Sequence, residues 1–199
     1  MSSPKCVRCA QILPPYGPAR SLCTACAAHR PFYNRGFALT KYESQVKTIF
    51  HEIKFQKKPW LLKVFSGVLA DFMISFSEFQ AYDMMIPIPL DRKKVRERGF
   101  NQAEVIAQML KHLDPENKIE IHPLIKKKKK TAPQSQLKRR ERLTNLNGAF
   151  SIKKSGGIKG KHILLVDDIF TTGSTIHECA KLLKENGAER VDFFTLARS

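Results

Sequence analysis

The stretch ILLVDDIFTTGST, residues 163–175, decides the fold. It opens with four apolar residues, which predict a strand buried on both faces, and Asp167 and Asp168 follow at the carboxyl end of that strand. The next loop is rich in threonine, glycine and serine and leads into an amphipathic helix, which Gly187 ends before a last strand over 191–197. A strand, a crossover helix and a second strand predict a parallel α/β sheet.

The same alternation recurs toward the amino terminus. An apolar strand over 84–88 precedes a basic loop, and Asn101 with Glu104 predicts the start of a helix, after which a strand is expected over 119–124. Two apolar helices are expected earlier in the chain, over 46–53 and from Pro59 to residue 76. The fold class is therefore α/β.

Two C-x2-C pairs near the amino terminus have the spacing of a zinc ribbon or knuckle. The expected ligands are Cys6, Cys9, Cys23 and Cys26. Four thiolates would close a tetrahedral shell around Zn²⁺ and leave no open position, so the metal would be structural. Two disulfides are the alternative, which a cytoplasmic chain disfavours. We expect a zinc module over 1–35 and a second domain over 36–199, with Cys179 a buried thiol on its helix.

Basic residues are concentrated in two segments of this 199-residue chain, which has 35 Lys and Arg, 18 Asp and Glu, and a net charge of +17. Residues 1–40 contain five basic residues and no acidic one, and residues 125–161 contain thirteen basic residues and only Glu141 as an acid. Such segregation predicts an anionic partner, and we expect contacts with single-stranded DNA. The predicted DNA-binding residues are Lys126, Lys127, Lys128, Lys129, Lys130, Lys138, Arg139, Arg140 and Arg142. A solvated basic loop is the alternative.

Aromatic residues after the cysteines offer a second test of nucleic-acid binding. They are Phe32, Tyr33, Phe37 and Tyr42. If these rings are exposed, they would stack on unpaired bases. The alternative, which is more common for aromatic residues, is that they are buried in the core.

The loop after the acidic pair predicts a phosphate site. Backbone N–H groups around Gly173, the nearby hydroxyls and the positive end of the following helix can surround one phosphate. The two carboxylates beside it can accept hydrogen bonds from sugar hydroxyls, which suits a sugar phosphate, and Mg²⁺ would help to bring further phosphates near them. A Walker B strand is a weak alternative because the sequence contains no G-x4-G-K-[ST].

These residues resemble the phosphoribosyl-pyrophosphate (PRPP) motif of type I phosphoribosyltransferases, which combines an apolar strand, two acids and T-T-G-S-T. The resemblance implies a phosphoribosyltransferase-like parallel-sheet core and a ribose site at Asp167 and Asp168. It implies 5′-phosphate binding by Thr171, Thr172, Gly173, Ser174 and Thr175. Residues 87–104 follow the strand after which that family places its pyrophosphate-binding loop, and they supply Arg92, Lys93, Lys94, Arg96 and Arg98.

Further motifs make the whole chain similar to the ComF family of competence proteins. They are the segment RERGFNQ, the four cysteines, VDDIFTTGST and a QxxLxxxxRxxN-like pattern at Gln134, Leu137, Arg142 and Asn145. The resemblance implies a role in natural transformation, with imported single-stranded DNA handled in the cytoplasm and the DNA-uptake machinery at the inner membrane as a partner.

Two further expectations concern location and chemistry. The apolar stretch 60–76 is interrupted by Lys63 and Asp71, and the amino terminus has no apolar run, so we expect a cytoplasmic chain without a transmembrane segment. The alternative function is an active Mg²⁺-dependent phosphoribosyltransferase that acts on an unidentified base. Residues 1–80 would then have to cover the base, because the sequence ends at Ser199, directly after its last expected strand.

Overall fold

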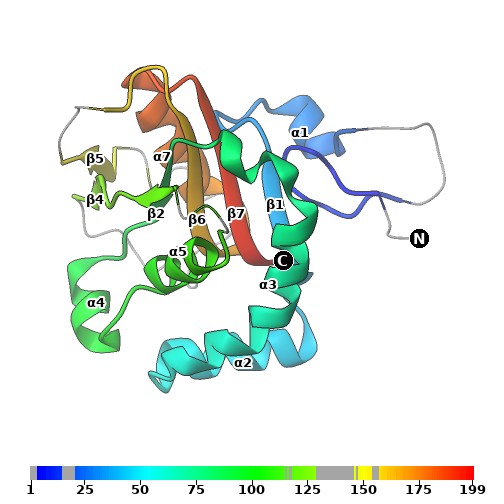
Figure 1. The fold of residues 1–199 in the computed structure, drawn as a ribbon, viewed down its shortest axis with the longest axis vertical. Helices are drawn as coiled ribbons and strands as arrows, with labels where there is room; N and C mark the ends of the chain where they lie inside the picture. The colour runs from blue at the N-terminus through cyan, green and yellow to red at the C-terminus, as the bar shows by residue number, and fades with distance from the viewer. Residues whose placement is uncertain are drawn as a thin grey trace.

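The computed structural model describes residues 4–14, 21–114, 116, 118–128, 146, 148–153 and 157–199. These residues form a five-stranded parallel sheet with the strand order β1-β7-β6-β2-β3, and a separate antiparallel pair, β4 and β5 (Figure 1). The strands are β1 (Gly36–Lys41), β2 (Met84–Pro87), β3 (Glu120–Ile121), β4 (Ile125–Lys127), β5 (Phe150–Ile152), β6 (His162–Phe170) and β7 (Arg190–Arg198). The parallel sheet confirms the predicted α/β class.

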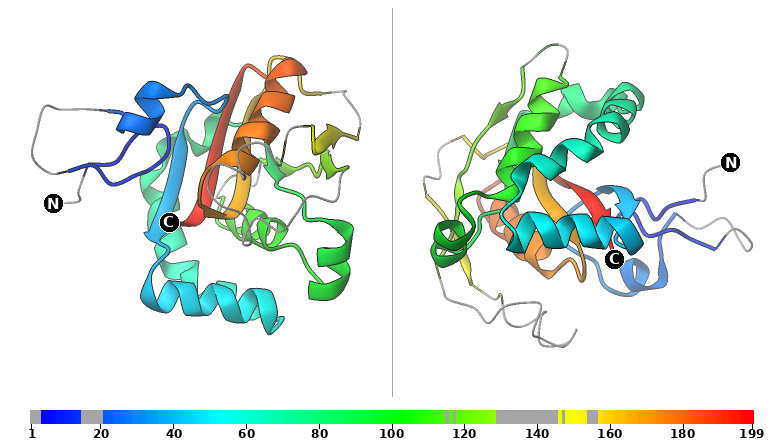
Figure 2. Two further views of the ribbon diagram at one scale, coloured as in Figure 1. Left: turned by 180° about the vertical axis from the view of Figure 1, so that it is seen from behind. Right: turned by 90° about the horizontal axis from the view of Figure 1, so that it is seen from below.

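Helices cover both faces of the sheet. They are α1 (Thr24–Ala28), α2 (Ser44–Phe55), η1 (Pro59–Phe65), α3 (Ser66–Ser75), η2 (Ser77–Ala81), α4 (Arg92–Arg98), α5 (Gln102–His112) and α7 (Ser174–Glu185), of which η1 and η2 are 3₁₀-helices. Figure 2 shows α7 against one face of the sheet and α3 and α5 against the other. Within the described part of the chain, no helix is both long enough and apolar enough to cross a bilayer.

Alternation along the central strand β6 divides the core into two layers. Ile163 and Leu165 belong to the apolar cluster that includes the buried face of α7, whereas Leu164 and Val166 belong to the cluster that includes α3 and α5. All four side chains are fully buried. A strand covered on both faces needs an unbroken apolar run, which explains why this segment has one.

Some element boundaries differ from the expectations. The helix expected from Pro59 is a 3₁₀-helix as far as Phe65, and the spacing of three between the buried Leu62 and Phe65 suits its three residues per turn. β3 has only two residues, since Pro123 cannot donate a hydrogen bond to the sheet. Helix α7 begins at Ser174, directly after Gly173 at its N-cap position.

The basic segment between β2 and α5 also differs from the expected loop, because it contains helix α4. Asp91 caps this helix by accepting a hydrogen bond from the N–H of Lys93 at 2.8 Å. Gly99 ends it with a left-handed φ of +86°, which glycine adopts without strain. This helix decides which way the basic side chains of the segment point.

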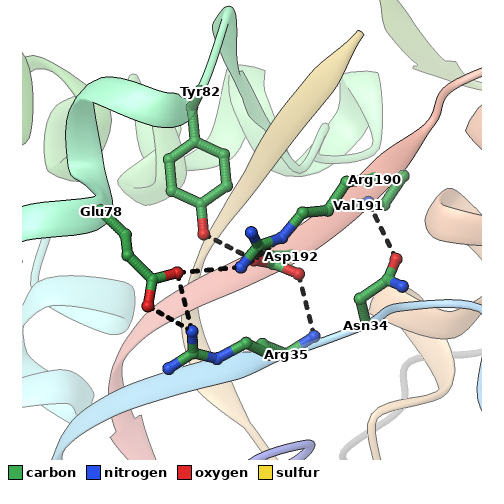
Figure 3. Close-up of polar contacts among 7 residues, drawn as sticks. All are labelled: Asn34, Arg35, Glu78, Tyr82, Arg190, Val191 and Asp192. Atoms are coloured by element: carbon green, nitrogen blue, oxygen red, sulfur yellow. Dashed lines mark hydrogen bonds and ion pairs between the residues drawn. The ribbon is translucent and has the colours of Figure 1, made fainter. Parts of the chain in front are cut away.

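A hydrogen-bonded network fixes the edge strand β1 to β7 (Figure 3). The fully buried Asp192 accepts hydrogen bonds from the hydroxyl of Tyr82 at 2.6 Å, the N–H of Arg35 at 2.9 Å and Nε of Arg190 at 2.8 Å. Glu78 accepts from the guanidinium groups of Arg35 and Arg190, and the hydrogen bonds from Arg35 in particular lower its pKa. The buried carboxylate is therefore paired, as burial of a charge requires.

Candidate functional site

The four amino-terminal cysteines lie together in space. Their sulfur atoms are all within 4.8 Å of one another, and the thiols of Cys9 and Cys23 are 3.7 Å apart. Ligands about 2.3 Å from a tetrahedral Zn²⁺ lie about 3.8 Å from each other, so this cluster could hold a metal such as zinc. None of the five cysteines forms a disulfide, and Cys179 is fully buried as predicted.

Backbone N–H groups favour one of the thiolates. Burial opposes ionisation of Cys6, but hydrogen bonds from the backbone at Cys23, Cys9 and Arg8 prevail and lower its pKa to about 7. Burial and the neighbouring thiolates raise the pKa of Cys26. A bound cation would favour the deprotonated form of all four sulfurs, since the thiolate is the metal ligand.

Arg198, at the end of β7, links the cysteine cluster to the sheet. Its Nε donates to the carbonyl oxygen of Cys9 at 2.7 Å, and its guanidinium carbon lies 5.2 Å from the ring centroid of Phe170. Phe170 ends β6 and stacks on Phe193 with ring centroids 4.9 Å apart. The cluster therefore packs directly against the strands that carry the acidic pair.

The acidic pair lies near the carboxyl end of β6. Adjacent strand residues point to opposite faces, so Asp167 is on the α7 side and Asp168 on the α2 side. Burial, followed by repulsion from Asp168, raises the pKa of Asp167 to about 8. Its Oδ1 accepts a hydrogen bond from the backbone N–H of Asp168 at 2.9 Å. Asp167 therefore holds its proton more tightly than an ordinary aspartate, whereas Asp168 is paired with a cation.

That cation is Lys54 of α2, which sequence reasoning did not identify. Its Nζ is 2.6 Å from Oδ2 of Asp168, and the two side chains are only 23% and 13% exposed. Figure 2, seen from below, shows α2 crossing in front of the sheet. Helix α2 thus brings a partly buried cation to the acidic pair from 114 positions away in the chain.

The loop between β6 and α7 makes a tight turn at Gly173. Its φ is +78°, and a Cβ at this position would lie 2.5 Å from Cζ of Phe170, so both conformation and space require glycine. The hydroxyls of Thr172 and Ser174 are 2.7 Å apart, and the 12-residue helix α7 begins directly after Gly173. The loop therefore presents hydroxyls and backbone N–H groups at a positive helix end.

Two basic side chains of α4 lie near the acidic pair. Lys94 and Arg98 are one helical turn apart and half-buried, and burial lowers the pKa of both. Repulsion from Arg98 and from Lys54 lowers the pKa of Lys94 further, whereas Asp168 opposes the shift of Arg98. These side chains are therefore within electrostatic range of one another.

Lys127 of β4 lies beside Lys94. Burial and then repulsion from Lys94 lower the pKa of Lys127. We call Lys54, Lys94 and Arg98 the cation cluster, and Lys127 lies at its edge. Burial lowers the pKa of Lys94 and of Arg98, and a bound anion would favour the charged forms of both side chains.

The remaining predicted basic residues lie elsewhere or cannot be placed. Arg92, Lys93 and Arg96 are exposed on another face of α4, where they line a groove with Lys126 and Lys128. Six predicted DNA-binding residues lie outside the described residues, namely Lys129, Lys130, Lys138, Arg139, Arg140 and Arg142. The motif positions Gln134, Leu137 and Asn145 also lie outside them.

The aromatic residues after the cysteines are mostly core residues. Tyr33 is buried against Phe193, and Phe37 and Tyr42 pack against the apolar cluster on the α5 side of the sheet. Phe32 is 42% exposed and lies near His177. Of the four rings, Phe32 has the exposure that stacking on a base requires.

Residues 95–199, more than half of the chain, match the phosphoribosyl transferase domain family. The chain is 29% identical to Competence protein F of Haemophilus influenzae over 203 residues, which are 100% of this chain and 86% of that protein. It is 30% identical to DNA utilization protein YhgH of Escherichia coli O157:H7 over 183 residues, which are 89% of this chain and 78% of that protein. The chain belongs to the ComF family of phosphoribosyltransferase-like proteins.

A third ComF-family relative has higher sequence identity over a shorter region. Competence protein ComFC of Bacillus subtilis is 34% identical over 161 residues, which are 79% of this chain and 62% of that protein. The family resemblance drawn from the sequence motifs is confirmed by these similarities.

Proposed function

We propose that this ComF-family chain is a competence protein that handles imported single-stranded DNA in the cytoplasm and binds PRPP or a related ribose phosphate. The names of its relatives support the biological role. The observation that carries ribose-phosphate binding is the ion pair between Lys54 and Asp168, with Arg98 and Lys94 nearby, beside a glycine loop that opens onto a helix. That arrangement offers separate places for a sugar, a monophosphate and a diphosphate.

Each part of the ligand has a chemical partner in the proposed site. The 5′-phosphate accepts hydrogen bonds from N–H groups and hydroxyls of residues 171–175, where the helix end adds positive potential. Asp167 and Asp168 bind the ribose hydroxyls. A carboxyl group that keeps its proton, as Asp167 does, can donate a hydrogen bond as well as accept one.

The diphosphate binds the cation cluster. The α4 members Lys94 and Arg98 are half-buried and aligned one turn apart, so their contribution is greater than that of exposed neighbours. Lys54 is held by Asp168 before the ligand arrives and can transfer its hydrogen bond to a phosphate oxygen. The ligand also restores the pKa of Lys94, because a nearby anion favours the charged ammonium.

Two metals have different roles in the proposal. Zn²⁺ held by the four cysteines is structural, and it fixes the segment that packs against Arg198 and Phe170. Mg²⁺ would enter with PRPP, because it prefers carboxylate and phosphate oxygens. Asp168 is the protein carboxylate that could share it.

Calorimetric titration with PRPP and Mg²⁺ tests this function. We expect saturable binding to the wild-type chain and at least about tenfold weaker binding to Arg98→Gln, since one lost contact between charged groups accounts for about 1.4 kcal/mol or more. Arg96→Gln is the matched control, because Arg96 lies on the same helix but lines the groove. Equal loss in both variants, or no binding to the wild type, contradicts the proposed site.

A second candidate function, turnover of PRPP with a base, is favoured by one pocket. A pocket of about 200 Å³ lies where β1 and β7 end, lined by Gln11, Thr40 and Arg198 among others. Its amide, hydroxyl and guanidinium groups could bind the edge of a planar base. Release of pyrophosphate that depends on an added base would establish the transferase, whereas binding of PRPP without release under any base favours the binding protein.

A further inference from the structure

Helix α4 separates two basic surfaces. Lys94 and Arg98 belong to the cation cluster, whereas Arg92, Lys93 and Arg96 line an open groove of about 890 Å³ between α4 and the antiparallel pair β4–β5. The spacing explains the division, because residues four apart lie on one side of a helix and residues two apart do not. One short helix therefore contributes cations to two different places.

The groove is strongly basic along both walls. Seven cations line it, from α4 on one wall and from the β4–β5 segment on the other: Arg92, Lys93, Arg96, Lys126, Lys127, Lys128 and Lys153. The acidic lining residues are Asp91 and Glu104. Asp91 caps α4 with its side chain, so its charge is partly offset by the backbone at the helix start. The groove therefore has an excess of five positive charges. Such a groove favours an anion that has several negative charges along its length.

The groove also has apolar lining residues. Its apolar lining residues are Pro87, Pro89, Leu90, Val95, Pro123 and Ile125. Val95 is exposed although it is apolar, and Lys126 and Lys128 are exposed on either side of the half-buried Lys127. A groove lined by cations and by apolar side chains suits a chain that has phosphates along its backbone and flat apolar faces on its bases.

The geometry points to this groove as the binding site for the backbone of single-stranded nucleic acid, occupied at the same time as the ribose-phosphate site on the opposite side of α4. The inference rests on the proposed function, which it extends by separating the two ligands. A duplex fits less well, since its phosphates lie on the outside of a wide cylinder and its bases are stacked inside, away from the apolar lining. An acidic peptide would pair with the cations but has no flat bases to place against the apolar lining residues.

Binding of a fluorescent oligothymidylate, followed by anisotropy at several salt concentrations, tests the groove. Arg92→Gln, Arg96→Gln and Lys128→Gln combined should weaken binding about tenfold or more and make the logarithmic salt slope shallower by about 2, because each phosphate contact to a single strand contributes about 0.7. Unchanged affinity and slope overturn the proposal. Equal or tighter binding of a duplex of the same length overturns the assignment to single strands.

Simultaneous occupancy is tested by adding saturating PRPP with Mg²⁺ to the same assay. We expect less than about a twofold change in oligonucleotide affinity, whereas strong competition would place both ligands in one site and refute the inference. Arg98→Gln provides the discriminating control, since it should lose PRPP and retain the oligonucleotide. If the wild type does not bind PRPP at all, the proposed function fails, while the result for the triple variant still decides whether the groove binds nucleic acid.

Discussion

Replacing Asp167 with asparagine should stabilise the protein, and more so as the pH rises. Burial and the adjacent Asp168 raise the pKa of Asp167 from an ordinary 3.8 to about 8. The folded protein therefore keeps a proton that the unfolded chain loses between pH 4 and pH 8. Since the unfolded state binds fewer protons over this interval, the free energy of unfolding falls as the pH rises. Asparagine carries no ionisable group and removes that loss.

The size of the effect follows from the difference between the two pKa values. Each pH unit between them corresponds to about 1.4 kcal/mol, so the upper limit at pH 8 is about 5 to 6 kcal/mol. Asp167 is only half-buried, so access to water reduces this limit, and we expect a gain of about 1 to 2 kcal/mol at pH 8. For a chain of this length, that gain corresponds to about 2 to 8 °C in Tm. At pH 5 the gain should be less than half as large.

Thermal unfolding followed by circular dichroism at pH 5, 6, 7 and 8 measures this difference. The Oδ1 of asparagine can still accept the hydrogen bond from the N–H of Asp168, so the substitution changes charge more than shape. A variant that is less stable than the wild type at every pH, or a gain that does not change with pH, would refute the reasoning.

Asp83→Asn is the matched control with the opposite sign. A hydrogen bond from Lys161, together with one from the backbone N–H of His162, lowers the pKa of Asp83. This carboxylate therefore stabilises the folded state above its unfolded pKa and loses that contribution as the pH falls through its folded pKa. Asp83→Asn should be less stable than the wild type at pH 7, and the difference should shrink toward acid pH.

Three further changes test other parts of the site. Gly173→Ala should lower the free energy of unfolding by more than about 1 to 2 kcal/mol and abolish PRPP binding, because the new Cβ clashes with Phe170 and the backbone is left-handed. Gly157→Ala is the control, since Gly157 has a φ of +92° in open space and the variant has the backbone strain alone. Equal effects in the two variants contradict this account. Cys23→Ser should lose the bound metal and loosen the amino-terminal segment, and elemental analysis that finds full retention would exclude Cys23 as a ligand. Lys54→Met should weaken PRPP binding most at low salt, and a calorimetric affinity unchanged at low salt would remove Lys54 from the ligand site.

Local sequence patterns are sufficient to predict the central strands and the cysteine cluster. The apolar runs of β2, β6 and β7 are buried on both faces, so their composition alone distinguishes them from surface segments. The paired cysteines have a spacing that few other structures require. These features depend on neighbouring residues, which a single sequence displays directly.

Features that depend on distant pairing were not predictable in the same way. The edge strand β1 is held by β7, more than 150 residues away, and by the buried network at Asp192. The ion pair between Lys54 and Asp168 likewise depends on how α2 crosses the sheet. The helix α4 is different, because Asp91 and Gly99 were available as start and stop signals. Using those signals would have separated Lys94 and Arg98 from the other basic residues before the structure was known.

A crystal structure of the chain with Mg²⁺ and PRPP tests the central claim most directly. The account predicts the 5′-phosphate within hydrogen-bonding distance of the backbone N–H groups of residues 172–175, the ribose beside Asp167 and Asp168, and the diphosphate near Lys94 and Arg98. A loop whose phosphate position is filled by protein side chains, with PRPP absent or bound elsewhere at saturating concentration, would contradict it.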